Sequence, residues 1–378
     1  MKKTTPRRTC ARVALVAAAL FLNGHAALAA PEDGQKKEDS ERIHPMEFVA
    51  PEFRGALTHT LEAYQGQAMS FSAETLSAMR EGTARMMAAQ QPLPSPAVEE
   101  VMIPGPEGAP DVKVYVIGAG KGEPRPAILH LHGGGYILGS ARDDVPRLQK
   151  IADDHDGVIV TVDYRLAPET PFPGPLEDNY AALKWLHDNA ETLGVDRSRI
   201  AVMGESAGGG HAAMLAIAAR DRGEISLNHQ ILIYPMLDDR TGSTREMPYW
   251  MGYGSWTAEA NRYGWSSLLG VPAGSDTVPA GSVPARVENL EGLPPTFIGV
   301  GSIDLFADED IEYARRLVNA GVPTELLVVP GGFHGFQFMV PEAESSQRFN
   351  AAVDAAISRA FAAPVNADAD KNAQEEDS

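Results

Sequence analysis

Cysteine is almost absent from this 378-residue chain, whose one cysteine is Cys10. Cys10 falls in an N-terminal segment that we expect to be cleaved. The mature chain then forms no disulfide and has neither a cysteine nucleophile nor a thiolate metal site. After residue 30 the sequence also lacks any run of about 20 uninterrupted apolar residues, the length that a membrane-spanning helix needs. These absences predict a mature chain with no stable membrane insertion, whose chemistry relies on other side chains.

Positive charge is scarce as well. The chain has 32 lysines and arginines against 51 aspartates and glutamates, which gives a formal net charge of −19. Residues 1–29 hold five cations and no acid, so their removal takes the charge to −24. Nucleic acid and anionic lipid would repel so acidic a chain, which excludes nucleic acid as a partner. Solubility is the simplest reason for the acidic excess.

Sequence motifs for metals and phosphate-bearing cofactors are also missing. The pattern H-E-x-x-H does not occur, and Gly118–Gly122 has neither the spacing nor the serine or threonine of a phosphate-binding loop. We therefore expect the protein to need no metal and no organic cofactor.

The first 29 residues have the pattern of a signal peptide. A basic start is followed by an apolar run from Val13 to Leu22 and by the small-x-small cleavage site Ala27-Leu28-Ala29. The pattern predicts a periplasmic or secreted protein. Arg7-Arg8 leaves twin-arginine export open as an alternative route.

Composition divides the rest of the chain into three kinds of segment. Residues 30–45 form a polar linker and residues 364–378 an acidic tail, both expected to be disordered. Residues 46–97 form an N-terminal helical segment, because apolar residues recur there at helical spacing. Residues 98–363 form one large α/β domain. Within it, residues 241–286 carry three of the four tryptophans, which indicates either an insertion over a pocket or the ordinary packing of a connecting helix.

The α/β domain shows short β-branched runs that alternate with longer amphipathic ones. This alternation predicts a mostly parallel, eight-stranded sheet flanked by helices. The predicted strands are 98–103, 112–117, 127–131, 158–162, 200–203, 230–234, 295–300 and 325–329. The predicted helices are 142–154, 176–189, 207–220, 307–320 and 344–361.

The strongest motif is Gly204-Glu205-Ser206-Ala207-Gly208, which stands between a predicted strand and a predicted helix. This is the G-x-S-x-G nucleophile elbow in the context that it requires. The elbow holds its serine in a strained backbone conformation, so the flanking glycines let strand and helix approach closely. The motif predicts that Ser206 is a nucleophile.

A second motif, His132-Gly133-Gly134-Gly135, directly follows the strand predicted at 127–131. Three consecutive glycines leave backbone N–H groups free to point into a cavity with no side chain in the way. That is the requirement of an oxyanion hole, and a flexible loop is the alternative interpretation.

A serine nucleophile needs a base, and His334 is the best candidate among the ten histidines. It stands in the glycine-rich loop Gly331–Phe336, just after the last predicted strand. His132 belongs to the glycine motif, and His211 lies on the helix after the serine, where packing is the expected role.

The base in turn needs an orienting carboxylate, for which we favour Asp304. It is the first acid after the strand predicted at 295–300, and the order Ser206, Asp304, His334 is the chain order expected of this fold. Asp308, Glu309 and Asp310 are rivals, but they are typical of an acidic, capping first turn of the next helix.

With these residues in place, the chain resembles the bacterial hormone-sensitive-lipase-like (family IV) esterases of the α/β-hydrolase superfamily. The resemblance covers most of residues 98–340. Beyond the two glycine motifs it includes the segments Asp163–Glu169, Tyr234-Pro235 and Gly292–Thr296. It implies that residues 46–97 form a helical cap and that 98–363 is the catalytic domain. Two residues depart from the family pattern, which often has aspartate where this chain has Glu205 and proline where it has Leu305.

The resemblance also implies the roles of the remaining motif residues. The N–H groups of Gly134, Gly135 and Ala207 would form the oxyanion hole, and His132, Gly133 and Glu205 would support the two motifs. The expected activity is hydrolysis of short- to medium-chain carboxylic esters through an acyl-enzyme on Ser206. The expected partner is a small-molecule ester, and the oligomeric state, including a homodimer, stays open.

Two alternatives remain at this point. An amidase or a lactonase would use the same three catalytic residues. A ligand-binding receptor would keep the pocket on a hydrolase scaffold, although binding alone has no use for an intact Ser206, His334 and Asp304.

Overall fold

A computed structural model describes residues 42–63, 71–87 and 91–362. The predicted signal peptide, nearly all of the polar linker and the acidic tail lie outside these residues and stay predictions. Among the described residues no helix has the length and apolar character needed to cross a membrane.

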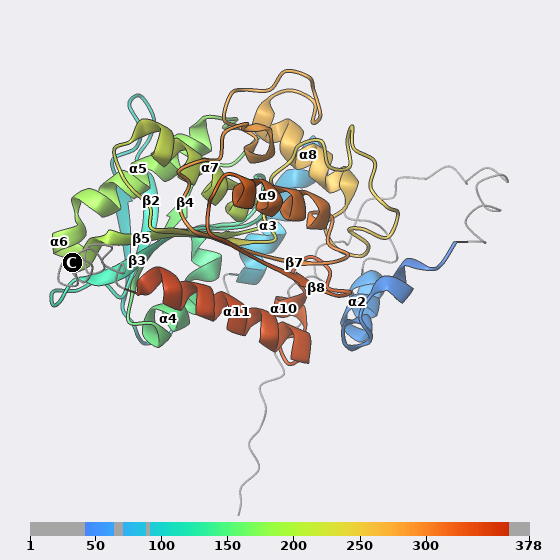
Figure 1. Cartoon of the computed structure of the whole chain (residues 1–378), viewed down its shortest axis with the longest axis horizontal. Coiled ribbons are helices and arrows are strands. Elements are labelled where there is room, and N and C mark those ends of the chain that lie inside the picture. The colour runs from blue at the N-terminus through green and yellow to red at the C-terminus, as the bar shows by residue number, and fades with distance from the viewer. Residues whose placement is uncertain (1–41, 64–70, 88–90, 363–378) are drawn as a thin grey trace, which may run out of the picture.

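One eight-stranded sheet forms the centre of the molecule (Figure 1). Its spatial order is β1-β2-β4-β3-β5-β6-β7-β8. The pairs β1–β2 and β2–β4 are antiparallel and all other pairs are parallel, as predicted for a mostly parallel sheet. The strands span β1 Val98–Ile103, β2 Val112–Ile117, β3 Arg125–Leu131, β4 Val158–Asp163, β5 Val195–Glu205, β6 His229–Ile233, β7 Thr296–Gly301 and β8 Thr324–Val329.

Helices cover both faces of this sheet. Figure 1 shows α4, α10 and α11 on one face and α5, α7 and α9 on the other. The helices span α2 Pro51–Ala63, α3 Ala73–Met87, α4 Ala141–Asp154, α5 Gly174–Asp188, α6 Ala190–Leu193, α7 Ala207–Arg222, α8 Ala258–Leu269, α9 Ala307–Asn319, α10 Phe336–Met339 and α11 Glu344–Phe361, with 3-10 turns at Pro45–Phe48 and Pro284–Arg286.

Side-chain alternation along the strands supplies two hydrophobic cores, one on each face. In β4, Val158, Val160 and Val162 join the core under α5 and α7, whereas Ile159 joins the core under α4 and α11. Successive side chains of a strand point to opposite faces, so a strand covered on both sides reads as a continuous apolar run. This is why the buried strands could be located from the sequence.

Strand register places the two glycine motifs side by side. Leu131, the last residue of β3, pairs with Gly204 near the end of β5. The loop that begins at His132 therefore emerges next to Ser206, at the carboxyl edge of the sheet.

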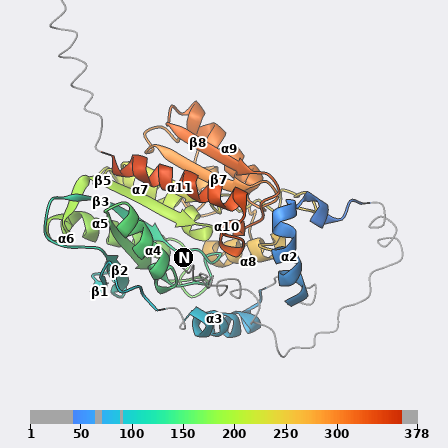
Figure 2. The same ribbon diagram turned by 90° about the horizontal axis from the view of Figure 1, so that it is seen from below.

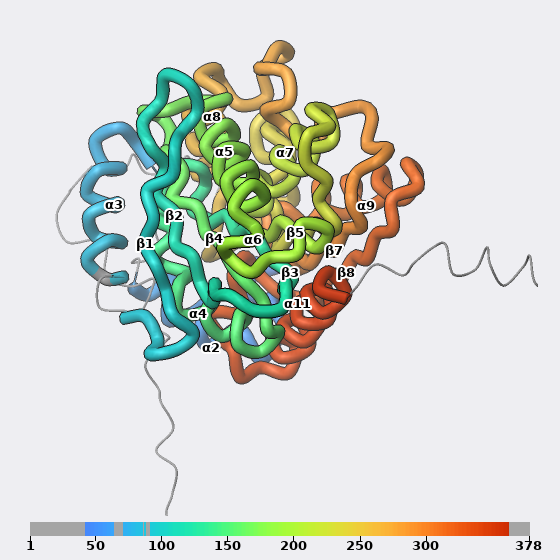
Figure 3. The backbone as a smooth tube through the Cα atoms, turned by 90° about the vertical axis from the view of Figure 1, so that its left-hand side faces the viewer, coloured from blue at the N-terminus to red at the C-terminus, as the bar shows by residue number. Residues whose placement is uncertain are grey.

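The N-terminal helices contact the loops at this same edge. Figure 2 shows α2 beside α10, and Figure 3 shows α3 on the outside of the sheet beyond β1. Phe53 of α2 is fully buried, with its ring centroid 6.0 Å from that of Phe333 and 5.1 Å from that of Phe336. Arg80 of α3 donates hydrogen bonds to the carbonyl oxygens of Ile137 (2.8 Å) and Ala167 (2.7 Å). The described part of this region contains the helices α2 and α3, and its role as a cap stays a prediction.

Candidate active site

Ser206 occupies the sharp turn between β5 and α7. Its backbone has φ 57° and ψ −122°, a conformation that is costly for a residue with a side chain. The turn is as tight as the sequence predicted. A Cβ on Gly204 would lie 2.3 Å from the carbonyl oxygen of Gly208, and one on Gly208 would lie 2.0 Å from that of Leu131. Only glycine at both positions lets helix and strands approach this closely.

The structure brings the three predicted residues together. His334 Nε2 lies 2.9 Å from Ser206 Oγ, and His334 Nδ1 lies 2.8 Å from Asp304 Oδ2. Because a carboxylate only accepts, Nδ1 carries the imidazole proton and Nε2 is left to accept from the serine hydroxyl. Asp304 is fully buried, and its Oδ1 accepts a hydrogen bond from the Phe306 N–H at 3.1 Å.

Two aromatic rings fix the orientation of the histidine. Tyr234 and Phe306 contact the His334 ring edge-to-face, with centroids 4.6 Å and 5.2 Å away. Rings packed on two sides limit the rotation of the imidazole, so its two nitrogens stay directed at their partners.

The rival acids lie in the first turn of α9 as predicted, but the capping interpretation is wrong for two of them. Glu309 and Asp310 are buried, and Glu309 Oε1 accepts hydrogen bonds from the N–H groups of Leu237 (2.7 Å) and Asp238 (3.1 Å). Glu309 therefore ties α9 to another segment instead of capping its own helix. Burial raises the pKa of both carboxyls well above their ordinary values.

The glycine loop lies against Ser206 in a shape that only glycine permits. Gly134 and Gly135 have φ values of 125° and 60°. A Cβ on Gly134 would lie 2.1 Å from the carbonyl oxygen of Leu138, and one on Gly135 would lie 2.2 Å from the Trp256 ring. The N–H groups of these two glycines donate to none of the described residues. Together with Ala207, the first residue of α7, they are available to a ligand oxygen.

His132 holds the start of this glycine loop in place through its contacts with Tyr164 and Gly133. Its ring stacks on Tyr164 with centroids 4.2 Å apart and planes 6° from parallel, and its Nδ1 lies 2.8 Å from the Gly133 carbonyl oxygen. The Tyr164 hydroxyl donates to the His132 carbonyl oxygen at 2.6 Å. Burial lowers the pKa of His132, so its imidazole is neutral.

Glu205, the residue before the nucleophile, lies at the centre of a buried charge network. Its carboxylate lies 2.9 Å from His130 Nε2 and 2.9 Å from Arg147 Nη1, and Arg147 also pairs with Asp144 at 2.9 Å. Burial opposes the charge of Glu205, but Arg147 and His130 outweigh it and hold the pKa of the carboxyl below its ordinary value.

His130 and Arg147 were missed by the sequence reasoning. His130 was placed within a strand, and it lies in β3 two residues before His132, the first residue after the end of that strand. That spacing was the available signal. Ligand atoms of His130, Asp144 and Glu205 lie within 4.8 Å of one another, but the Arg147 guanidinium lies among them and supplies the positive charge.

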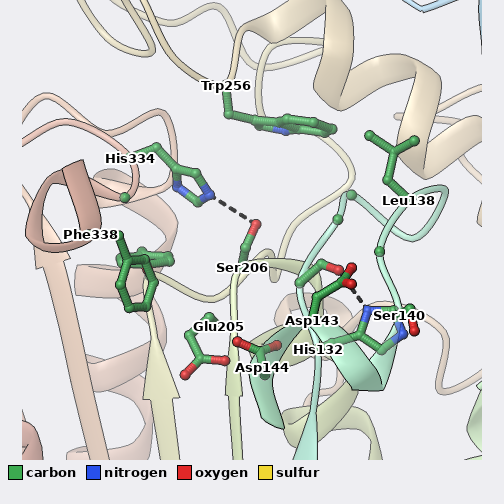
Figure 4. A pocket seen from close by; sticks show the side chains of 16 residues that line it. His132, Leu138, Ser140, Asp143, Asp144, Glu205, Ser206, Trp256, His334 and Phe338 are labelled. Atoms are coloured by element: carbon green, nitrogen blue, oxygen red, sulfur yellow. Dashed lines mark hydrogen bonds between the residues drawn. The ribbon is translucent and has the colours of Figure 1, made fainter. Parts of the chain in front are cut away.

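A cavity of about 380 Å³ opens over Ser206 (Figure 4). The aromatic segment 241–286 fits both of its interpretations in part. Trp256 lines this cavity, as expected of an insertion over a pocket, whereas Trp265 is fully buried in the core, as expected of ordinary helix packing. The cavity is lined by His132, Gly133, Gly134, Gly135, Leu138, Gly139, Ser140, Asp143, Asp144, Glu205, Ser206, Tyr234, Trp256, His334, Gly335 and Phe338.

Comparisons with known proteins relate the chain to α/β hydrolases. A family model described as "alpha/beta hydrolase fold" matches residues 128–338. Esterase LipI of Mycobacterium tuberculosis is 34% identical over 264 residues, which is 67% of this chain and 80% of the relative. Ethyl acetate hydrolase of Pseudomonas putida is 34% identical over 219 residues, 56% of this chain and 66% of the relative. The solved structure titled "Bacterial Heroin Esterase" has a TM-score of 0.76 at 34% identity and covers 85% of this chain and 100% of its own.

Gly135→Ala is expected to lower kcat/KM by about 10²-fold, the typical effect of losing one oxyanion-hole donor. The added methyl would meet the Trp256 ring at 2.2 Å in a backbone with φ 60°, so the loop must shift. Gly321→Ala is the control, since Gly321 has φ 76° and open space around its Cβ position. Equal activity of both variants, from ester kinetics on folded protein, would show that the shape of the loop is unimportant.

Glu205→Gln is expected to lower the free energy of unfolding by about 3 kcal/mol at pH 7, because it leaves Arg147 and His130 facing a neutral partner. The folded-state pKa of Glu205 lies below its ordinary 4.5. Its stabilising effect is thus fully present above that pH and is lost as the pH falls through the folded value. Urea denaturation from pH 3 to 8 should show that the free energies of unfolding of wild type and variant become equal at acidic pH.

Glu309→Gln is the matched control for this prediction. It also replaces a buried glutamate, but one whose pKa is raised and whose Oε1 accepts two backbone N–H groups that an amide oxygen can accept as well. We expect Glu309→Gln to lower the free energy of unfolding by less than Glu205→Gln does. An equal loss in both variants would contradict the role of the Glu205 charge.

Proposed function

Because the chain belongs to the bacterial hormone-sensitive-lipase-like (family IV) esterases and is a carboxylic ester hydrolase, we propose that it cleaves short- to medium-chain esters through an acyl-enzyme on Ser206. The observation that carries the mechanism is the chain of hydrogen bonds from Asp304 through His334 to the Ser206 hydroxyl.

In the first half-reaction His334 Nε2 removes the proton of the Ser206 hydroxyl as Oγ attacks the ester carbonyl carbon. The separation of 2.9 Å between the two atoms supports this transfer. The imidazolium that forms faces the buried Asp304 carboxylate at Nδ1, which stabilises its charge and holds its tautomer.

The developing oxyanion lies against the N–H groups of Gly134, Gly135 and Ala207. Support comes from the two free loop N–H groups and from the position of Ala207 at the N-terminus of α7, where the helix dipole favours negative charge. His334 then protonates the leaving alcohol, and the acyl group stays on Ser206.

In the second half-reaction His334 deprotonates a water molecule that attacks the acyl carbonyl carbon. The same N–H groups stabilise the second oxyanion, and the proton returns to Ser206 as the acid leaves. The chain's own residues supply every group that these steps need.

The size of the cavity supports a limit on substrate length. A volume of about 380 Å³ is near the lower end of small-molecule sites. Leu138, Trp256 and Phe338 supply apolar wall that suits an acyl or alkyl group. Among the relatives, the Pseudomonas putida enzyme is named for ethyl acetate, a short ester.

An amidase or lactonase activity on the same residues remains the alternative within hydrolases. Family membership disfavours the receptor alternative, because the relatives are esterases. Comparing p-nitrophenyl acetate with p-nitroacetanilide, which differ only in the bond that is cleaved, separates an esterase from an amidase.

Ser206→Ala and His334→Ala are each expected to lower kcat on p-nitrophenyl acetate by at least about 10³-fold, and Asp304→Asn by about 10⁴-fold through loss of the correct tautomer. A double variant of Ser206 and His334 should be no slower than either single one, because the residues act as a unit. Mass spectrometry after a fluorophosphonate probe should place the label on Ser206. Activity that survives Ser206→Ala in folded protein would remove the acyl-enzyme from the proposal.

A p-nitrophenyl ester series from acetyl to palmitoyl tests the size limit. We expect kcat/KM to be highest between about two and eight acyl carbons and to fall for longer chains as the acyl group outgrows the cavity. A maximum at palmitoyl would instead indicate an open lipid-binding surface.

A further inference from the structure

The wall of the cavity over Ser206 has three carboxylates that the catalytic steps do not use, those of Asp143, Asp144 and Glu205, and of these Asp143 alone has no salt-bridge partner among the described residues. We propose that Asp143 is a specificity-determining residue that favours esters bearing an alkylammonium group. The inference rests on the proposed ester hydrolysis at Ser206 and names a substrate class for it.

Charge pairing singles out Asp143 among the acids of the cavity wall. Asp144 and Glu205 both pair with Arg147 at 2.9 Å, and Glu205 also faces His130. Asp143 forms no salt bridge with any residue that the structure describes. Asp143 therefore adds a negative charge that no described cation pairs with, and a substrate cation would neutralise it.

The helix that carries Asp143 holds it at the pocket. Ser140 is the N-cap of α4, and the Asp143 N–H donates to the Ser140 carbonyl oxygen at 3.0 Å. Asp163, at the end of β4, accepts the Ala141 N–H at 3.1 Å and so anchors the start of α4 to the sheet. A first-turn carboxylate also complements the helix dipole, and the test must therefore separate this structural role from substrate selection.

The surroundings of Asp143 disfavour its negative charge. Partial burial, with the neighbouring charges of Asp144 and Asp163, raises the pKa of Asp143 to about 6, against the opposing effects of Ser140 and Arg142. Arg142 is exposed at the surface of α4. An alkylammonium group in the cavity would reverse this balance and favour the charged form.

Aromatic side chains complete a site suited to such a cation. Trp256, Tyr234 and Phe338 line the same cavity, and Figure 4 shows the Trp256 indole across the pocket from Asp143. Aromatic faces attract alkylammonium groups, and a carboxylate adds its full charge. An ester with a free carboxylate would meet like charge here and be disfavoured.

The test compares two acetate esters of the same shape, acetylcholine and 3,3-dimethylbutyl acetate, which differ by a quaternary nitrogen in place of a quaternary carbon. For the wild type we expect kcat/KM to favour the cationic ester by about tenfold. Asp143→Asn keeps the size and removes the charge, so the ratio of the two values should fall toward one. A purely structural role of Asp143 would change both values together and leave the ratio unmoved.

Asp153→Asn is the matched control, since Asp153 is an exposed acid on the same helix and its loss changes the net charge equally. It should leave the ratio at its wild-type value. If the ratio fell equally in both variants, overall charge and not Asp143 would attract the cation, and the proposal would be wrong.

A measurement on the wild type alone keeps the proposal testable if Asp143→Asn does not fold. Tetramethylammonium chloride should compete with 3,3-dimethylbutyl acetate and raise its KM, whereas tert-butanol or sodium chloride at the same concentration should not. Absence of competition, or a wild-type ratio near one, overturns the inference while hydrolysis of the neutral ester still supports the proposed function. Hydrolysis of neither ester by folded protein would reject both.

The ratio should also depend on pH. As the pH falls through about 6, Asp143 takes up a proton, and the preference for the cationic ester should weaken. Any effect of pH on the catalytic steps that the two esters share cancels in the ratio. The charged groups that act on Asp143 are Asp144, Asp163 and Arg142, and a ratio constant from pH 5 to 8 would contradict a charge-based preference.

Discussion

The close approach of β3, β5 and α7 around Ser206 is the constraint on which the rest of the site depends. Gly204 and Gly208 allow it, and Ser206 adopts a positive φ because the chain must reverse within one residue. The reversal exposes the serine hydroxyl at the carboxyl edge of the sheet. The residue before it, Glu205, is at the same time buried beneath the turn, where it needs a cationic partner.

Most of the fold and the three central residues could be predicted because their signals are local. Apolar runs locate the doubly covered strands, and a glycine motif between a strand and a helix locates Ser206. Contacts between residues far apart in the sequence carry no such signal, which is why the contact of Arg147 on α4 with Glu205 at the end of β5 was missed. The burial of Glu309 did have a local signal, because Glu309 lies four residues before Tyr313 and thus on the face of α9 that packs inward.

The scarcity of cations gives the arginines a specific role in this acidic chain. Arg165 pairs with the fully buried Asp178 at 2.6 Å, and Arg286 pairs with the fully buried Asp239 at 2.7 Å. Asp310 is as deeply buried, yet neither of its oxygens has a hydrogen-bond partner among the described residues, and its pKa is raised instead. Of these three buried carboxyls, two are thus matched by an arginine and the third is held toward its neutral form.

The packing of α2 on the loop that carries His334 determines which residues a functional fragment of the protein must include. The region that defines the family, residues 128–338, contains every group expected to touch an ester. Yet Phe53 lies far outside it and packs on Phe333, the immediate neighbour of His334, and the Ala50 N–H donates to the Gly331 carbonyl oxygen at 3.1 Å. The family match thus contains the residues expected to touch the substrate but not every residue that holds them in place. A fragment limited to residues 128–338 would keep Ser206, Asp304 and His334 but would lose the packing of α2 against the loop that carries His334.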